Sequence, residues 1–215
     1  MPKRWIERLL FAETCALCGE PLGASSVVCD RCLLSIHPQP EEDLLSISYL
    51  DGYKTFTRYG EREKRLLHLV KFEGLKHLAR ELGRLISSHL RAYVERLSPS
   101  AVVPVPTNPF RYWFLRGFDP VEEILRETGI PYQRLIKRRW LWRKPLSKAK
   151  SVDERRRLVR GAFTLKEKYI PRLSGARILL FDDVLTSGAT ASELAYILKS
   201  VGVKEVYLFA VFRPH

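Results

Sequence analysis

Two adjacent carboxylates and a loop of small hydroxyl residues lie next to each other near the carboxyl end of the chain. Asp182 and Asp183 end an apolar run that predicts a buried strand. The loop that follows offers hydroxyl groups, a flexible backbone and a helix start, at Thr186, Ser187, Gly188, Ala189 and Thr190. Open parallel sheets bind ligands beyond the carboxyl ends of their strands, and helix N-termini attract phosphate. We therefore predict a phosphate cradle whose carboxylates accept hydrogen bonds from vicinal hydroxyls, such as those of a ribose.

A capped strand-to-helix turn without any ligand is the alternative interpretation of this segment. Paired carboxylates at a buried strand end are costly unless they meet a ligand or a cation, which favours the binding site. The loop also lacks the Gly-Lys-Ser/Thr ending of a nucleotide-triphosphate P-loop.

The four cysteines form a second group with its own chemistry, and all of them fall in one short window, at Cys15, Cys18, Cys29 and Cys32. Two Cys-x-x-Cys pairs can offer four thiolates to one tetrahedral ion, and four protein ligands leave no open position, so we predict structural Zn²⁺. Gly19 is expected to take a positive φ where the backbone turns beneath the metal. Disulfides or unrelated buried thiols are the alternatives, and a reducing compartment disfavours the disulfides. His37 is expected to be a bystander.

Positive charge is concentrated in one stretch of the chain. The formal net charge is +13, and residues 134–160 carry twelve Lys or Arg against Asp153 and Glu154, an excess of ten. A localised field of this kind indicates a polyanionic partner, either a phosphorylated metabolite or a nucleic acid. The alternative is a solvated surface loop of a thermostable protein.

Aromatic residues lie within the same basic stretch, with Tyr132 just before it. Cations that follow phosphates and rings that stack on bases are what a single-stranded nucleic acid surface requires. The candidate residues for such a surface are Arg138, Arg139, Trp140, Trp142, Arg143 and Lys144. Packing of the two tryptophans under a lid is the alternative.

The elements that position these residues follow from the hydrophobic periodicity. Helices are predicted over residues 2–12, 61–72, 75–97, 119–128 and 190–201. Strands are predicted over residues 101–105, 132–136, 177–182 and 205–212, with a hairpin of strands 44–50 and 53–59 around Asp51-Gly52. The alternation of strand and helix predicts an α/β fold, a mainly parallel sheet with helices on both faces. We predict a helix and zinc module over residues 1–42 and an α/β domain over residues 43–215.

The sequence also bears on where the protein works. No apolar run approaches the roughly 20 residues of a membrane span, which predicts no membrane insertion. The first residues lack the apolar core and cleavage site of a secretory signal. A cytoplasmic, reducing environment is therefore expected.

Residues 181–190, Phe-Asp-Asp-Val-Leu-Thr-Ser-Gly-Ala-Thr, resemble the signature of type I phosphoribosyltransferases. The resemblance implies that Asp182 and Asp183 are the catalytic-site residues that bind the ribose hydroxyls of phosphoribosyl pyrophosphate (PRPP), with Mg²⁺ on the same substrate. It also implies that residues 186–190 grip the 5-phosphate. The implied fold is that of the type I phosphoribosyltransferases, which is Rossmann-like.

Phosphoribosyl transfer displaces pyrophosphate through a cation-like transition state, so the leaving group needs charge stabilisation. The loop that begins at Val105 and contains Arg111 and Arg116 is expected to hold the pyrophosphate. Residues 138–150 lie where such enzymes carry a mobile loop that closes over the site and excludes water.

Nearly the whole chain resembles the ComF/GntX family of competence-related proteins. The resemblance rests on the four-cysteine N-terminus, Val-Pro-Val-Pro at 103–106, Arg-Gly-Phe at 116–118 and Arg-Leu-Val-Arg-Gly-Ala-Phe at 157–163. It implies a link to natural transformation, in which single-stranded DNA reaches the cytoplasm. It also implies partners in the DNA-uptake machinery, such as a helicase or a DNA-processing protein.

Three positions depart from the family pattern. Asp119 and Leu158 stand where family members usually have Asn, and a Gln usual near Ser147 is missing. These departures concern the second substrate or the loop chemistry, and no motif for an acceptor is legible. Three hypotheses follow: a phosphoribosyltransferase, a single-stranded DNA-binding protein with a regulatory or vestigial phosphoribosyl site, and a sensor that binds the metabolite without transfer.

Overall fold

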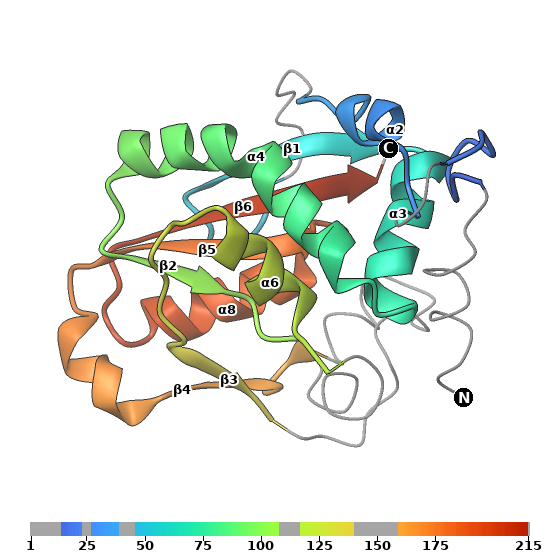
Figure 1. Ribbon diagram of the computed structural model, residues 1–215. Coiled ribbons are helices and arrows are strands. Elements are labelled where there is room, and N and C mark those ends of the chain that lie inside the picture. The colour runs from blue at the N-terminus through green and yellow to red at the C-terminus, as the bar shows by residue number, and fades with distance from the viewer. Residues whose placement is uncertain (1–13, 23–26, 39–45, 108–116, 140–158, 215) are drawn as a thin grey trace.

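A four-stranded sheet forms the centre of the protein (Figure 1). The computed structural model describes residues 14–22, 27–38, 46–107, 117–139 and 159–214. In these residues the order of the main sheet is β1-β6-β5-β2, and all three pairings are parallel. The strands are β1 (Gly52–Tyr59), β2 (Ala101–Pro104), β5 (Arg177–Val184) and β6 (Glu205–Pro214). The predicted fold class is confirmed, since helices cover both faces of this sheet.

Within the described ranges, three helices cover one face of the sheet. They are α3 (Glu61–Phe72), α4 (Lys76–Leu97) and α6 (Pro120–Glu127). Their buried leucines and isoleucines form one hydrophobic cluster with Leu179 and Phe181 of β5 and Phe209 of β6. Because side chains alternate along a strand, these residues all point to the same face.

The opposite face is covered by α8 (Ala189–Lys199) and by a small two-stranded sheet. Ile178 and Leu180 of β5 join Leu194 and Leu198 of α8 in a second cluster. The small sheet pairs β3 (Ile136–Arg138) with β4 (Phe163–Leu165) in antiparallel register, and the 3-10 helix η3 (Glu167–Arg172) follows it. The core therefore lies in two layers, one on each side of the sheet.

The predicted hairpin of strands 44–50 and 53–59 is wrong. Only its second strand forms, as β1, and β1 pairs in parallel with β6. The backbone N–H of Asp51 donates to the Val206 carbonyl (2.9 Å), and its carboxylate accepts from the Val206 N–H (2.7 Å). These bonds direct the chain onto β6, and the described residues 46–50 form a turn instead of a strand.

The predicted strand 132–136 is also wrong for most of its length. The Gln133 N–H donates to the Val102 carbonyl (2.9 Å), but residues 132–135 form no ladder. Only Ile136 enters a strand, and that strand belongs to the small antiparallel sheet. The prediction missed its partner, β4, because the three residues of β4 are too few to show a period.

The other predicted strands and helices of the α/β part are confirmed to within two residues. The helix predicted for residues 2–12 and the boundary predicted at residue 42 lie outside the described residues. Within those residues, the structure contains no helix that combines the length and apolar character of a membrane span.

Candidate functional site

The two carboxylates at the end of β5 point to opposite faces of the sheet. Asp183 shares the parity of Phe181 and therefore faces the side of α3, α4 and α6, whereas Asp182 shares the parity of Leu180 and faces the side of α8. The Asp182 carboxylate accepts the backbone N–H of Asp183 at 2.8 Å. The pair is therefore held by the strand itself, and each carboxylate faces a different layer of the molecule.

Asp183 is almost fully buried, with 4% of its surface exposed. Its Oδ1 lies 2.7 Å from Nζ of Lys71, in the last turn of α3. Its Oδ2 is buried and has no hydrogen-bond partner among the described residues. A buried acceptor without a partner marks a position where a ligand hydroxyl, a water molecule or an ion belongs.

The environment of Asp182 disfavours its charged form. Burial raises its pKa well above the ordinary value, and the negative charges of Asp183 and Asp119 raise it further. The positive charge of Lys71 and the hydrogen bond from the Asp183 N–H act in the opposite direction. Carboxylates with pKa values displaced in this way are typical of binding and catalytic sites.

The loop between β5 and α8 has the geometry of a phosphate cradle. Gly188 takes a left-handed conformation (φ +71°) directly before α8. The first helical hydrogen bond is donated by the Ser192 N–H to the Gly188 carbonyl (2.8 Å), so the N–H groups of residues 189–191 precede it. Thr186 is exposed, and Ser187 and Thr190 are partly exposed. Free N–H groups and accessible hydroxyls at a helix N-terminus are suited to bind an anion.

A second strand end lies beside this loop. Asp119, after β2, caps α6 by accepting the N–H groups of Val121 (2.9 Å) and Glu122 (3.3 Å). Its other carboxylate oxygen accepts the Thr107 hydroxyl at 2.7 Å. Burial raises the pKa of Asp119, and the hydrogen bond from Thr107 opposes that rise. A carboxylate can therefore cap this helix where the family usually has Asn.

The carboxyl ends of β2 and β5 form a topological switch point. The connection after β2 leads to α6 on one face, and the connection after β5 leads to α8 on the other face. A crevice opens where neighbouring parallel strands continue to opposite faces, and such crevices are the usual ligand sites of α/β sheets. Asp182, Asp183 and the loop between β5 and α8 lie at this position.

The residues predicted to hold pyrophosphate are only partly described. The Val105 N–H donates to the Phe181 carbonyl at 2.8 Å, and its side chain is buried in the second cluster. Val105 can therefore contribute backbone but no exposed side chain. Arg111 and Arg116 lie outside the described residues.

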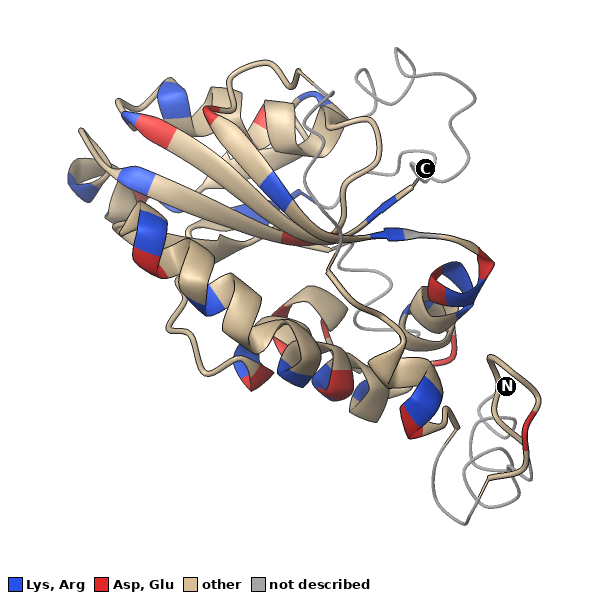
Figure 2. Ribbon diagram, turned by 90° about the horizontal axis from the view of Figure 1, so that it is seen from above, with Lys and Arg blue, Asp and Glu red and all other residues tan. Residues whose placement is uncertain are grey.

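The predicted nucleic acid residues also lie mostly outside the described residues, namely Trp140, Trp142, Arg143 and Lys144. Arg138 belongs to β3, and its guanidinium lies 5.3 Å from the centre of the Phe163 ring. Arg139 is exposed, and its N–H donates to the Ala162 carbonyl (2.8 Å). Elsewhere in the described part, Lys and Arg stand beside Asp and Glu along the helices (Figure 2).

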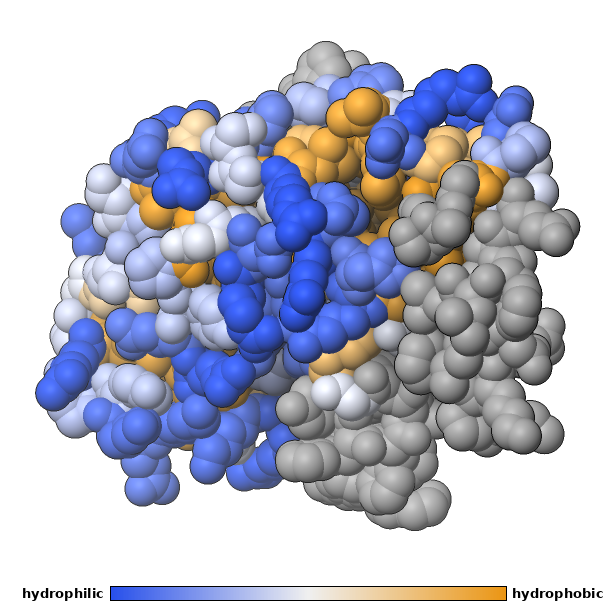
Figure 3. Space-filling model, in the orientation of Figure 1, coloured by the Kyte–Doolittle hydropathy of each residue, from blue (hydrophilic) through white to orange (hydrophobic). Residues whose placement is uncertain are grey.

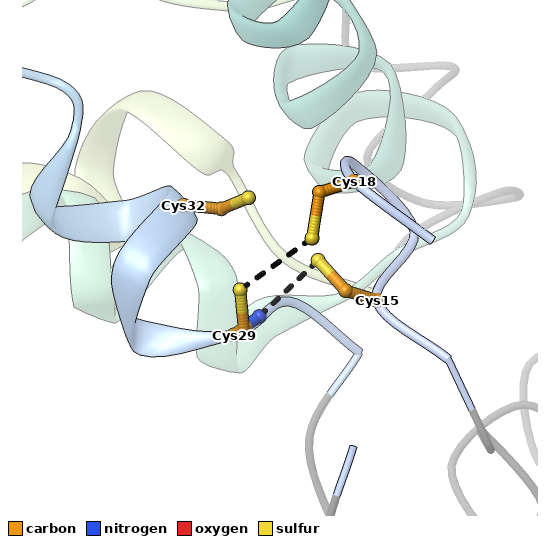
Figure 4. A group of neighbouring side chains, drawn as sticks. All are labelled: Cys15, Cys18, Cys29 and Cys32. Carbon is orange, nitrogen blue, oxygen red and sulfur yellow. Dashed lines mark hydrogen bonds between the residues drawn. The ribbon is translucent and has the colours of Figure 1, made fainter. Parts of the chain in front are cut away.

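The four cysteines come together as a candidate metal centre. Their sulfur atoms all lie within 4.8 Å of one another, and Sγ of Cys18 is 3.8 Å from Sγ of Cys29 (Figure 4). All four are free thiols. The N–H groups of Leu17 and Cys29 each donate to Sγ of Cys15 at 3.4 Å. Four sulfur atoms in one cluster with N–H···S bonds fit a metal ion such as zinc.

The ionisation of the thiols supports this assignment. Burial raises the pKa of Cys15, but hydrogen bonds from the backbone of Cys29, Cys18 and Leu17 outweigh this and lower it to about 6. Burial raises the pKa of Cys32 to about 12, and the neighbouring sulfur atoms add to that rise. Four thiolates this close repel one another, and a divalent cation removes the repulsion.

The cysteine module packs directly on the α/β part. Cys15 and Cys32 are buried in the same hydrophobic cluster as Leu66 of α3 and Leu78 of α4, and Cys32 lies on the short helix α2 (Asp30–Leu34). Apolar surface remains visible around α2, where Leu34 is 72% exposed (Figure 3). Gly19 has the predicted positive φ (+78°), and His37 is exposed. The sequence did not predict α2, which is only five residues long.

Sequence reasoning missed Lys71 and Thr107. Lys71 is one of several cations on α3, and nothing in its spacing separates it from the solvated ones. Only the packing of α3 against the end of β5 reveals its partner. The sequence signal for Lys71 is a basic residue in the last turn of α3, and this signal is weak because such residues are common at helix ends.

Comparison with known proteins gives relatives over most of the chain. Competence protein F of Haemophilus influenzae is 28% identical over 210 residues, which cover 93% of this chain and 84% of that protein. Competence protein ComFC of Streptococcus pneumoniae is 29% identical over 162 residues, with 75% and 68% covered. DNA utilization protein YhgH of Escherichia coli K12 is 27% identical over 209 residues, with 93% and 83% covered. No protein-family model matches the chain.

Among solved structures, the similar chains include a Trypanosoma cruzi hypoxanthine phosphoribosyl transferase. Its TM-score is 0.34 at 10% identity, with 66% of each chain covered. The allosteric regulatory enzyme of purine biosynthesis gives a TM-score of 0.35 at 19% identity, and the match covers 61% of this chain but only 25% of that one. The fold assignment rests on the parallel sheet and its helices described above.

The sequence relatives and the observed architecture agree with the resemblance found in the sequence. The sheet is parallel and flanked by helices, and four neighbouring cysteines precede it. The curated relatives carry competence or DNA utilization names across most of this chain. The relatives therefore support the resemblance to the ComF family, and the parallel sheet with helices on both faces supports the expected α/β fold.

Proposed function

We propose that the protein binds PRPP together with Mg²⁺ at the carboxyl end of β5 and the N-terminus of α8. The observation that carries this proposal is the pairing of Asp182 and Asp183 with the left-handed Gly188 at the start of α8. The carboxylates accept the ribose hydroxyls, and residues 186–190 bind the 5-phosphate through N–H and hydroxyl groups. Mg²⁺ bound to the same substrate would neutralise its pyrophosphate.

The chemical class that fits this site is phosphoribosyl transfer. Departure of pyrophosphate from the ribose requires stabilisation of the leaving charge and exclusion of water. Arg111, Arg116 and the backbone at Val105 are our candidates for holding the leaving group. The acceptor that attacks the ribose is left open, and binding without transfer is a separate outcome of the same experiment.

Isothermal titration calorimetry with PRPP and Mg²⁺ tests the proposal. The wild-type protein should release or absorb heat, and Asp182→Asn/Asp183→Asn should abolish the signal while Glu95→Gln, an exposed carboxylate of α4, leaves it unchanged. A wild-type protein without detectable heat contradicts the proposal. Pyrophosphate release in an acceptor screen then separates a transferase from a sensor.

The cysteine module has a structural role in this proposal. Four thiolates would fill the coordination of Zn²⁺, so no position remains for a substrate or an activated water molecule. The ion would fix a segment whose buried residues already contribute to the cluster under α3 and α4.

Single-stranded DNA binding is the second candidate function. It is supported by the ten excess positive charges of residues 134–160, which include exposed Arg139 at the edge of the described part. Binding should weaken steeply with salt, and Arg138→Ala/Arg139→Ala/Arg143→Ala should lower the slope by about 0.7 per lost phosphate contact. Arg172→Ala, an exposed cation of η3, is the matched control. Salt-independent binding, or no binding, removes this candidate.

A further inference from the structure

Lys71 reaches the carboxylate pair from a different layer of the molecule. It lies in the last turn of α3, on the sheet face to which Asp183 points, and its Nζ is 2.7 Å from Oδ1 of Asp183. The side chains of the two residues are 23% and 6% exposed. The ion pair is therefore largely removed from water. In this buried position its geometry is well defined, and salt screens it little.

The two oxygens of Asp183 have different surroundings. Oδ1 accepts the hydrogen bond from Lys71, whereas Oδ2 is buried and has no partner among the described residues. A buried carboxylate oxygen that makes no hydrogen bond costs free energy, unless a bound molecule supplies the donor. Lys71 thus fixes the orientation of the carboxylate and leaves one oxygen available to a ligand.

Three carboxylates gather at this edge of the sheet. Burial raises the pKa of Asp182 and of Asp119, the charge of Asp183 adds to both rises, and the charge of Asp119 adds to that of Asp182. In the described part of the chain, Lys71 is the cation that forms an ion pair with any of the three. A buried ion pair of this kind adds little stability compared with an apolar replacement, so a role in ligand binding explains it better.

We propose that Lys71 is a positioning residue of the phosphoribosyl site. It holds the Asp183 carboxylate in one orientation, so that Oδ2 accepts a hydrogen bond from a hydroxyl of the ribose. The inference rests on the proposed function, since it assigns a role in recognising the hydroxyls of the same ligand. Lys71 acts through Asp183 and is not assigned a contact with the reacting atoms.

Hydroxyl recognition can be measured apart from phosphate recognition. The probes are ribose 5-phosphate and its 2-deoxy and 3-deoxy analogues, which keep the phosphate and remove one hydroxyl each. A hydrogen bond from a hydroxyl to a carboxylate contributes about tenfold or more in affinity. The wild-type protein should therefore bind ribose 5-phosphate at least about tenfold more tightly than one of the two deoxy analogues.

In Lys71→Met this ratio should fall towards one, because the Asp183 carboxylate loses the contact that orients it. Lys64→Met is the matched control on the same helix, where an exposed lysine pairs with Glu61. The control should keep the wild-type ratio. A merely structural role of Lys71 lowers the thermal stability without changing the ratio in the folded protein, so an unchanged ratio overturns the inference.

Lys71→Met leaves Asp183 buried without a cation and can unfold the protein, so Lys71→Met/Asp183→Asn is measured beside Asp183→Asn. If Lys71 acts through Asp183, the two variants should show the same ratio, whereas a further loss in the double variant contradicts the inference. A wild-type protein that binds neither ribose 5-phosphate nor PRPP with Mg²⁺ refutes the proposed function instead. Failure of the two proposals is therefore distinguishable.

Discussion

Ile47 packs directly against Gly188, so a residue that precedes the first strand closes one side of the loop between β5 and α8. A Cβ atom placed on Gly188 would lie 2.8 Å from Cγ1 and 2.9 Å from Cδ1 of Ile47. Gly188 also has a φ of +71°, which residues with a side chain rarely adopt. Two independent constraints therefore require glycine at this position.

Gly188→Ala should destabilise the protein and weaken phosphate binding. The left-handed conformation costs about 1–2 kcal/mol for a residue with a Cβ, and the contact with Ile47 adds about 1–3 kcal/mol of overpacking. Chemical denaturation and titration with ribose 5-phosphate measure the two effects.

Gly175→Ala is the control for this substitution, because Gly175 has a similar φ of +73° but nothing within 4 Å of an added Cβ. It should show only the conformational cost. In an Ile47→Ala background, Gly188→Ala should cost less stability than it does in the wild-type protein, since the shorter side chain makes room for the new methyl group. Equal destabilisation by the two glycine substitutions contradicts the role of Ile47.

The sequence was sufficient to predict the parts of the fold that have a strong period. In four elements, the positions of the apolar residues along the sequence match the side that is buried in the structure. These elements are α3, α4, β5 and β6. The hairpin was wrong because Asp51-Gly52 favours a turn locally, while the actual partner of β1 is β6, more than 150 residues later. Pairings over such a distance depend on the assembled sheet and leave no local pattern.

The candidate site also contains residues that the sequence predicts and residues that it does not. Asp182, Asp183 and residues 186–190 are contiguous, so the sequence alone brought them together. Lys71 and Thr107 come from elements that meet the site only after folding, and their residue types are common on any surface. Short-range chemistry was therefore predictable, whereas the partners that orient it were not.

Asp182→Asn should stabilise the protein at neutral pH in the absence of ligand. Burial, followed by the charge of Asp183, raises the pKa of Asp182 in the folded state above its ordinary value of 3.8. The folded state thus holds this proton more tightly than the unfolded state. The stability that Asp182 contributes is greatest below pH 3.8 and falls as the pH rises through the raised pKa.

Thermal unfolding of Asp182→Asn and of the wild-type protein between about pH 4 and pH 8 measures this effect. The unfolding temperature of the variant should exceed that of the wild type by a margin that grows with pH. The same variant should lose PRPP binding. Asp182 would then be shown to lower stability while it serves ligand binding. A margin that shrinks as the pH rises would show that Asp182 is ionised favourably in the folded protein.

Glu123→Gln should weaken the packing of α6 against α4 and lower the free energy of unfolding. Glu123 is 3% exposed and contacts Arg80 (2.8 Å), Lys76 (3.6 Å) and Arg126 (2.5 Å). Burial acts to raise its pKa, but these cations outweigh burial and lower it. The contribution to stability is therefore present at neutral pH and lost in acid. Since the cations are about half exposed, we expect a loss on the order of 2 kcal/mol in urea denaturation.

Glu127→Gln is the matched control for Glu123→Gln. Glu127 lies four residues later and pairs with Arg84 at 2.8 Å, but its side chain is 26% exposed. Its loss should cost about 1 kcal/mol or less. Equal costs at the two positions would mean that burial of Glu123 does not strengthen the network.

Removal of the metal should destabilise the whole protein without destroying the phosphoribosyl site. The purified protein should contain one equivalent of zinc per chain, because the four sulfur atoms form a single cluster. Cys15→Ser should lose the ion and lower the free energy of unfolding by several kcal/mol, since Cys15 and Cys32 belong to the cluster under α3 and α4. His37→Ala should retain the metal.

Below the unfolding temperature, Cys15→Ser should still bind PRPP with Mg²⁺, because the cysteines fill the metal's coordination and supply no group to β5 or α8. A folded, zinc-free variant that no longer binds PRPP would instead assign the metal a role in the site, transmitted through α3 and Lys71.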